Sequence, residues 1–212
     1  MPSDPTGRSG GGTTVSRRGL LQGSGGAAAG AALAENLLFG VQEAMARSRG
    51  PAVLGPGAVT VRLRVNGEER AVEIEPRTTL AEALRGPLGL TGTKVVCDRG
   101  SCSACEVWLD GVTVCSCQTL AIEAQGREIT TIEGLAKDGV LHPVQAAFVE
   151  HDAQMCGFCT PGMVMSCAAL LERTPAPSLE DVKTAVSGNL CRCGTYPKVF
   201  QAMLAAAGAR RT

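Results

Sequence analysis

Aromatic residues are scarce in this chain of 212 residues, since Phe, Tyr and Trp together make up only 3% of it. The core must therefore be built from Val, Leu, Ala and Met, in a chain long enough for one or two small domains. Histidine is rarer still, with only His142 and His151 present. A Rieske centre needs two histidines interleaved with cysteines, and this pattern is absent, so each histidine is predicted to cap a helix or to lie on the surface.

Charge of either sign is not in excess, because 20 Lys and Arg residues balance 20 Asp and Glu residues. Without a basic stripe, nucleic-acid binding is not expected. The sequence also lacks a dinucleotide-binding fingerprint, a P-loop and a nucleophile–base motif. We therefore expect no substrate chemistry on this chain, and no residue is predicted to be catalytic.

Cysteine, in contrast, is abundant, with ten residues of which eight form two quartets of different spacing. The first quartet is Cys97-x4-Cys102-x2-Cys105, closed by a fourth cysteine farther along the chain. This is the plant-type ferredoxin spacing, in which four thiolates hold a [2Fe–2S] cluster. Residues 115 and 117 share a face if the preceding strand continues, so the spacing leaves both Cys115 and Cys117 as candidates for the fourth ligand.

Small residues separate the first three cysteines, so the backbone of this segment can approach the sulfur atoms closely. Three cysteines within nine residues cannot share one helix face or one strand face, and a loop is predicted. Gly100 and Ser103 are expected to bring backbone N–H groups near the first cluster, where hydrogen bonds stabilise the reduced state. Zinc, disulfides and reduced core cysteines are the alternatives, but zinc sites usually show paired C-x2-C knuckles or histidine ligands.

The second quartet joins Cys156-x2-Cys159 to Cys191-x-Cys193, with thirty-one residues between the two pairs. Four such sulfurs fit either an iron pair or a zinc ion, so a second [2Fe–2S] cluster, structural zinc and two disulfides all stay open. Thr160-Pro161 is typical of a helix start, with Thr160 as N-cap and Pro161 as first helical residue. Such a helix would direct its N-terminus toward the metal.

Residues 1–46 resemble a leader rather than a folded domain. Residues 1–15 are rich in Gly, Ser and Thr and are predicted to be disordered. The segment Ser16-Arg17-Arg18-Gly19-Leu20-Leu21 then resembles a twin-arginine export signal. Polar residues interrupt the Gly- and Ala-rich stretch that follows, so no transmembrane span is predicted. The twin-arginine route exports folded proteins, as clusters acquired in the cytoplasm require, and the predicted location is the periplasm.

The first predicted domain covers residues 58–135 and is built around a small sheet. Val59 to Val65 alternates apolar and charged residues as a half-buried strand does. Asn66-Gly67 and Asp110-Gly111 are hairpin signals, and a short helix with a threonine cap is expected at residues 78–84.

The second predicted domain covers residues 140–208 and is helical, which makes the fold class α+β. Helices are expected to begin near Pro143, Thr160, Ser178 and Pro197. Cys167 is predicted to fill the core of this domain rather than to bind metal.

Three motifs make the chain recognisable: Thr91-Gly92-Thr93-Lys94, Cys156-Gly157-Phe158-Cys159-Thr160-Pro161-Gly162 and Gly188-Asn189-Leu190-Cys191-Arg192-Cys193-Gly194. Through them, residues 58–208 resemble the small iron–sulfur subunit of the molybdenum hydroxylases, the xanthine oxidase family. The resemblance implies a plant-ferredoxin-like β-grasp domain followed by a four-helix bundle, with a [2Fe–2S] cluster in each. It also implies Cys117, and not Cys115, as the fourth ligand of the first cluster.

The same resemblance implies a ligand set and partners. A separate large subunit would hold a molybdenum–pterin cofactor close to the second cluster, with Cys193 and Gln154 near the pterin. An FAD-binding subunit or a cytochrome-like acceptor would take the electrons. The metal ligands would be Cys97, Cys102, Cys105 and Cys117 for the first cluster, and Cys156, Cys159, Cys191 and Cys193 for the second.

Two departures from the family pattern concern the surroundings of the clusters. Many members have glutamine immediately before the C-G-F-C motif, where Met155 stands here and Gln154 comes one position earlier. Many also have glycine where this chain has Val96 and Ser103, which changes the hydrogen bonding expected around the first cluster.

The function expected from the sequence is therefore electron transfer within a periplasmic molybdenum hydroxylase of the aldehyde oxidoreductase type. One alternative is the iron–sulfur subunit of an N-heterocycle hydroxylase. Another is a free-standing ferredoxin-type carrier with a zinc-stapled helical module, and a third is an exported disulfide-rich binding protein.

Overall fold

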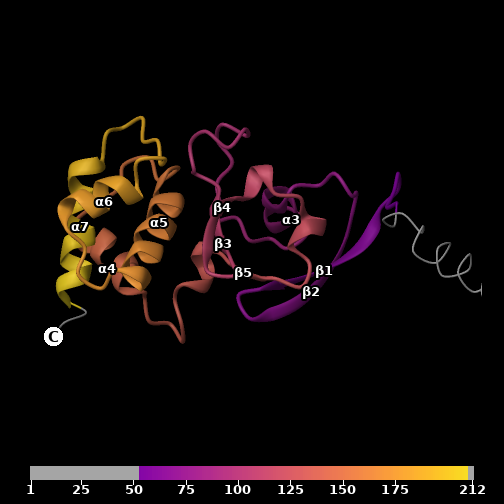
Figure 1. Cartoon of the computed structure of the whole chain (residues 1–212), viewed down its shortest axis with the longest axis horizontal. Helices are drawn as coiled ribbons and strands as arrows, with labels where there is room; N and C mark the ends of the chain where they lie inside the picture. Colours follow the sequence, from indigo (N-terminus) through magenta and orange to yellow (C-terminus); the bar gives the residue numbers. More distant parts are fainter. Residues whose placement is uncertain (1–52, 210–212) are drawn as a thin grey trace, which may run out of the picture. The chain divides into compact units, whose positions relative to one another are not determined.

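The structure, a computed structural model, describes residues 53–209, and those from Leu54 onward belong to one compact unit. The predicted leader of residues 1–46 lies outside the described residues. A five-stranded sheet with one α-helix among its strands comes first, and four α-helices follow it. Figure 1 shows this order along the chain. The strands are β1 (Val59–Val65), β2 (Glu68–Ile74), β3 (Glu106–Leu109), β4 (Val112–Cys115) and β5 (Glu128–Thr130). The α-helices are α3 (Leu80–Arg85), α4 (Pro143–Glu150), α5 (Thr160–Arg173), α6 (Leu179–Ala185) and α7 (Tyr196–Ala209).

Two hairpins, one parallel pairing and one further antiparallel pairing build the sheet, in the order β2-β1-β5-β3-β4. Asn66 and Gly67 join β1 to β2, and Asp110 and Gly111 join β3 to β4. All four residues have positive φ angles, between 52° and 84°, as the favoured two-residue hairpin turns require. Both predicted hairpins are therefore confirmed. Strand β5 pairs parallel to β1 and antiparallel to β3, and is therefore the central strand of the sheet.

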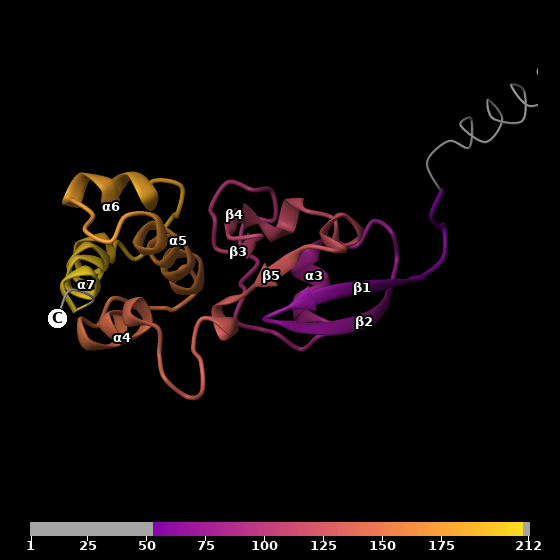
Figure 2. The same cartoon turned by 60° about the horizontal axis from the view of Figure 1, so that its bottom comes forward.

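Helix α3 packs on this sheet and leads into the first cysteine loop (Figure 2). Thr79 caps the helix, because its side chain accepts a hydrogen bond from the Glu82 N–H while the Glu82 carboxylate accepts one from the Thr79 N–H. Leu80 and Leu84 are fully buried in the same apolar cluster as the inward side chains of β1. After Gly86 the chain forms neither helix nor strand until β3, and the loop predicted for the first three cysteines, residues 97–105, lies within this stretch.

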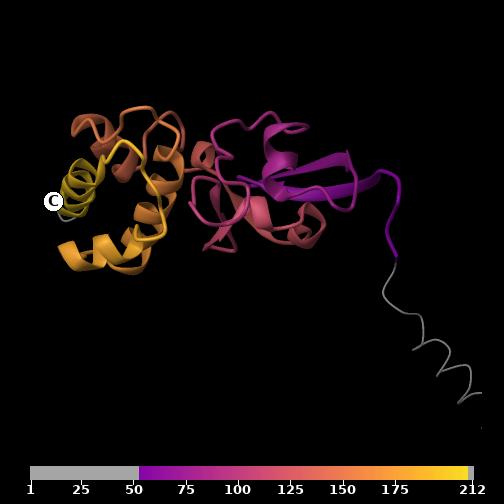
Figure 3. The same cartoon turned by 90° about the horizontal axis from the view of Figure 1, so that it is seen from above.

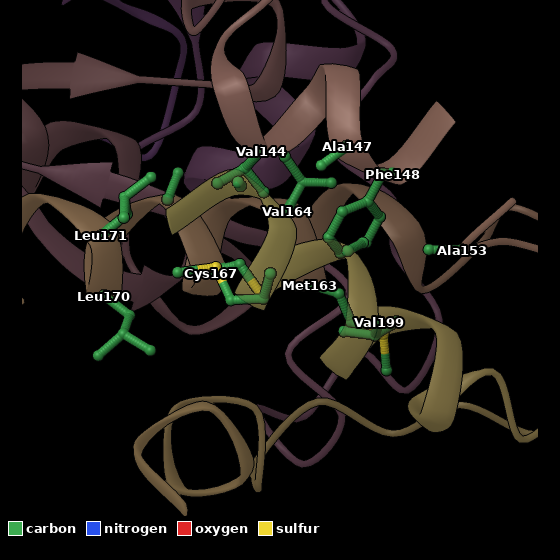
Figure 4. Close-up of a cluster of buried hydrophobic side chains, with 14 of the residues drawn as sticks. Val144, Ala147, Phe148, Ala153, Met163, Val164, Cys167, Leu170, Leu171 and Val199 are labelled. Carbon is green, nitrogen blue, oxygen red and sulfur yellow. The ribbon is translucent and has the colours of Figure 1, made fainter. Parts of the chain in front are cut away.

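The helices α4 to α7 share a second apolar core. Helix α7 contacts both α4 and α6, and Figure 3 shows it, in yellow, between them. Figure 4 shows Val144 and Phe148 of α4 close to Val164 and Cys167 of α5 and to Val199 of α7. Cys167 is fully buried, which confirms its predicted role as a core residue.

The predicted α+β class is confirmed, whereas the arrangement of the four helices as a bundle stays a prediction. One helix boundary was predicted wrongly: Cys159, not Thr160, is the residue before the first turn of α5. The Cys159 carbonyl oxygen already accepts the Met163 N–H at 3.0 Å, so Thr160 and Pro161 are the first two helical residues. Among residues 53–209, no helix is long and apolar enough to cross a membrane.

Candidate metal centres

The first cysteine loop turns sharply at residues with left-handed backbone conformation. Asp98, Gly100 and Ser103 have φ angles of 53°, 71° and 51°. This conformation favours glycine, so the backbone of Ser103 is strained at this position. The turns wrap the backbone around Cys97, whose Sγ accepts the Ser101 N–H at 3.3 Å.

Cys97 lies in a nest of backbone donors. Hydrogen bonds from the backbone of Arg99, from the thiol of Cys102 and from the backbone of Ser101 and Cys102 lower the pKa of Cys97 to about 7. Such N–H groups stabilise negative charge on sulfur, which is the property that a ligand of an iron–sulfur cluster needs. The backbone donors found here are Arg99, Ser101 and Cys102, whereas a contact of Gly100 and Ser103 with the first cluster stays a prediction.

The other three cysteines of the first quartet are buried. Cys102, Cys105 and Cys117 are each less than one tenth exposed, and the thiols of Cys105 and Cys117 are hydrogen-bonded to each other. Burial raises the pKa of the Cys105 thiol to about 12. Cys115 is half-buried at the end of β4, where its Sγ lies 3.8 Å from Gly100 O and 3.9 Å from Ser103 Oγ.

The second quartet lies where the start of α5 meets the turn between α6 and α7. Cys156 is hydrogen-bonded to Cys193 through both its backbone and its side chain, and these two cysteines are exposed. Cys159 and Cys191 are half-buried and share a hydrogen bond, and burial raises the pKa of Cys159 to about 12.

Cys191 has a donor nest of its own, comparable to that of Cys97. Burial opposes ionisation of Cys191, but hydrogen bonds from the Thr195 hydroxyl at 3.2 Å and from the Thr195 N–H outweigh it and lower the pKa to about 7. The Tyr196 hydroxyl accepts the Cys191 N–H at 2.9 Å and donates to Asn189 O at 2.8 Å. Tyr196 therefore holds the backbone of the C-x-C turn in place.

The thiols in both quartets meet as pairs. Within residues 53–209, no group of three or more Cys, His, Asp or Glu side chains is arranged to hold a metal ion. Neutral thiols can hydrogen-bond in pairs, whereas four thiolates around one centre repel one another unless iron neutralises them. The donor nests at Cys97 and Cys191 suit thiolate ligands, and the eight cysteines stay predicted ligands.

The two cysteine loops lie side by side. The Leu190 N–H donates a hydrogen bond to Cys102 O at 3.1 Å, which joins the backbone next to Cys191 directly to a cysteine of the first loop. Gly162, in the first turn of α5, is so close to the first loop that a Cβ on it would lie 2.1 Å from Ser103 O. A small cavity of about 100 Å³ between the loops is lined by Val96, Ala104, Cys156, Phe158, Cys159, Leu190 and Arg192.

A buried polar cluster beside the loops was not predicted from the sequence. Ser166 Oγ lies 2.5 Å from Glu106 Oε2 and 2.8 Å from Asn189 Oδ1, and the Asn189 amide donates to Glu106 Oε2 at 3.1 Å. The single hydroxyl hydrogen of Ser166 can serve one of its two partners at a time. Burial raises the pKa of Glu106, while the hydrogen bonds from Ser166 and Asn189 act in the opposite direction.

Gln154, the predicted pterin neighbour, is exposed beside the second quartet, and Met155 next to it is 70% exposed. A cavity of about 310 Å³ opens here, with Gln154, Gly157 and Thr160 on one side and Phe148 and Val149 of α4 on another. Both residues before the C-G-F-C motif therefore stand where a partner could reach them.

Comparisons with known proteins agree with two cluster-binding domains. Residues 63–131 match the 2Fe-2S iron-sulfur cluster binding domain, and residues 131–204 match the [2Fe-2S] binding domain. Over 150 residues, the chain is 48% identical to the nicotine 6-hydroxylase small subunit of Paenarthrobacter nicotinovorans, covering 71% of this chain and 90% of the relative. Over 210 residues, it is 38% identical to the aldehyde oxidoreductase iron-sulfur-binding subunit PaoA of Escherichia coli strain K12, covering 92% and 89%.

Two solved structures of oxidoreductases are also similar to this chain. The chain is similar to a chain of quinoline 2-oxidoreductase from Pseudomonas putida 86, with a TM-score of 0.69, 42% identity, and coverage of 73% of this chain and 96% of the other. It is also similar to the aldehyde oxidoreductase of Desulfovibrio gigas, with a TM-score of 0.67, 40% identity, and coverage of 72% of this chain but 17% of the other.

Two [2Fe–2S]-binding domains in one chain define an iron–sulfur protein with two clusters as its cofactors. With relatives of 38% to 48% identity that match along most of their length, the chain belongs to the family of small iron–sulfur subunits of molybdenum hydroxylases. The resemblance inferred from the cysteine motifs is thereby confirmed.

Proposed function

We propose that this chain transfers electrons from the molybdenum–pterin site of a large partner subunit, through its two [2Fe–2S] clusters, to an acceptor. The acceptor is an FAD-binding subunit or a cytochrome-like protein. The observation that carries this proposal is the juxtaposition of the two cysteine loops, joined by the hydrogen bond from Leu190 to Cys102. Two one-electron carriers held this close form a path through the chain, and no substrate chemistry on it is needed.

Exposure supports the direction of the path. In the second quartet Cys156 and Cys193 are exposed, whereas three of the four cysteines in the first are buried. Cys193 and Gln154 are therefore open to a partner that carries the pterin. We also propose that the sheet domain is a β-grasp and that α4 to α7 form a four-helix bundle.

Aldehydes are the proposed substrates of the complex. The relative PaoA, which matches over 92% of this chain, is named an aldehyde oxidoreductase subunit, and the similar protein from Desulfovibrio gigas is named an aldehyde oxidoreductase. The second candidate is an N-heterocycle, because the nicotine 6-hydroxylase small subunit has the higher identity, 48%.

We further propose that the chain is exported to the periplasm by the twin-arginine route. The support for this is the Arg17-Arg18 pair and the apolar stretch after it. A fusion of residues 1–50 to a reporter should be exported, and Arg17→Lys together with Arg18→Lys should retain it in the cytoplasm. A fusion that stays in the cytoplasm with both arginines intact would contradict export.

The complex itself is tested by purifying the chain from its native host under mild conditions and assaying the material for molybdenum, iron and flavin. We expect molybdenum to co-purify with iron, and electrons from an aldehyde to reduce the clusters faster than electrons from an N-heterocycle. A chain that purifies alone, with iron and zinc but no molybdenum, would support the free-standing carrier instead.

A further inference from the structure

Three buried polar side chains, Glu106, Ser166 and Asn189, lie together where β3 contacts α5, and the Thr113 side chain also hydrogen-bonds to the Glu106 carboxyl. The exposed fractions of the three buried residues are 9%, 5% and 2%. A carboxyl, a hydroxyl and an amide are costly to bury unless they hydrogen-bond to one another, and a hydrogen bond constrains direction as apolar contact does not. This cluster therefore fixes how the elements carrying it are aligned.

Each of these three polar residues lies in a segment that also carries, or directly follows, a predicted ligand of an iron–sulfur cluster. Glu106 directly follows Cys105 of the first quartet. Asn189 precedes Cys191 of the second quartet by two residues, and Ser166 is on α5, the helix that begins after Cys159. The three side chains thus connect segments that hold both metal centres.

Strand β3 turns one face toward α5, and this explains why Glu106 points inward. Val107 and Leu109 point into the sheet core, so the alternate residues Glu106 and Trp108 point the other way. The Trp108 indole N–H donates to Met165 O at 3.1 Å, next to the contact between Glu106 and Ser166. Both outward side chains of β3 are therefore bonded to consecutive residues of α5.

Asn189 connects this contact to the electron path. Besides Glu106, its amide lies 3.4 Å from Ser103 O in the first loop. The next residue, Leu190, donates its N–H to Cys102 O. Fixing the side chain of Asn189 thus fixes the backbone that joins the two loops.

We propose that Glu106 is a positioning residue for electron transfer between the clusters, acting through Ser166 and Asn189 to hold the Cys191-x-Cys193 turn against the first cysteine loop. This rests on the proposed function, because the clusters are taken to exchange electrons. Glu106 contacts neither iron–sulfur cluster in this role. It acts by keeping the two cysteine loops aligned.

The test compares four variants of the full chain with its clusters: Glu106→Ala, Glu106→Gln, Asn189→Ala and the double variant Glu106→Ala with Asn189→Ala. The control is Asn66→Ala. Asn66 also joins two segments, because its side chain hydrogen-bonds to Thr131, but it lies far from the cysteines in the sequence. Electron transfer between the clusters is followed after rapid partial reduction, and hydrogen exchange is measured over residues 188–193.

With four irons retained per chain, Glu106→Ala and Asn189→Ala should each slow the transfer several-fold and speed exchange at the Leu190 amide. The double variant should be no slower than either single variant, because both act through one contact. Glu106→Gln keeps the shape and an acceptor, and should stay close to the wild type. Asn66→Ala should leave the transfer rate unchanged even where it lowers stability.

If the wild-type chain shows no transfer between its clusters, the proposed function fails. If the wild type transfers electrons and Glu106→Ala, with iron intact, does so at the same rate, the positioning role alone is overturned. Should Glu106→Ala lose iron, Glu106→Asp takes its place, because it keeps the carboxyl but withdraws it from Ser166 and is expected to slow the transfer too. Equal rates for Glu106→Asp and the wild type would then overturn the role.

Discussion

Leu190 and Cys102 are joined by a backbone hydrogen bond of 3.1 Å, in which the Leu190 N–H donates to the Cys102 carbonyl oxygen. The residues are far apart in the sequence, yet each belongs to a cysteine loop, and Leu190 immediately precedes Cys191. This bond connects the backbones of the two quartets directly. The proposed conduction of electrons through this chain depends on it.

Removing that bond should slow electron transfer without removing a ligand. Leu190→Pro eliminates the N–H donor, at a cost of about 1 kcal/mol for the lost hydrogen bond. Leu190→Ala is the matched control, because it keeps the N–H and the Leu190 side chain is 56% exposed. Rapid reduction followed by spectroscopy should show slower transfer only in Leu190→Pro. Equal rates in the two variants would exclude a role for this bond.

Gly162 should tolerate no side chain, because a Cβ there would lie 2.1 Å from Ser103 O. Gly162→Ala must push α5 away from the first loop, and should lower the free energy of unfolding by about 2 kcal/mol or more. Gly208→Ala in α7 is the control, since a Cβ there meets nothing within 4 Å. That control should be neutral or stabilising by up to about 1 kcal/mol. Chemical denaturation of both variants measures the difference, and equal stabilities would contradict the close packing.

The choice between Cys115 and Cys117 can be tested by electron paramagnetic resonance. Cys117 is 3% exposed and hydrogen-bonded to Cys105, so Cys117→Ser should lose one of the two reduced-cluster signals. Cys115→Ser should keep both signals, because a hydroxyl can replace the long contacts of this thiol with Gly100 O and Ser103 Oγ. The reverse pattern would show that Cys115 is the ligand.

Cys167 should affect stability but not iron content. It is fully buried in the helical core, and burial raises the pKa of its thiol to about 12, so it stays protonated at neutral pH. Cys167→Ser places a hydroxyl among apolar side chains and should cost about 1–3 kcal/mol of stability. Thermal unfolding and iron assay check both statements. A loss of iron from a variant that is still folded would mean that Cys167 is a ligand after all.

Much of the fold could be predicted because the signals are local. The Asn66-Gly67 and Asp110-Gly111 turns and the alternation in β1 act over a few residues. Cysteine spacing is equally local, so both quartets are recognisable from the amino-acid sequence alone.

The cluster of Glu106, Ser166 and Asn189 could not be predicted, for a physical reason. In isolation, the segment Glu106–Leu109 is a strand with a charged residue on its outer face, which normally faces water. Here α5 covers that face, and only the folded chain brings Ser166 and Asn189 to the carboxyl. The start of α5 was missed by one residue because Thr160 and Pro161 suit an N-cap and N1 pair as well as the N1 and N2 pair that they form.

The most direct test of the account is the metal content of the purified chain. Two [2Fe–2S] clusters held by eight cysteines require four irons and four acid-labile sulfides per chain, no zinc, and two distinct signals in electron paramagnetic resonance after reduction. Two irons with one zinc, or a colourless protein without iron, would contradict the central claim that this chain carries two electron-transfer clusters.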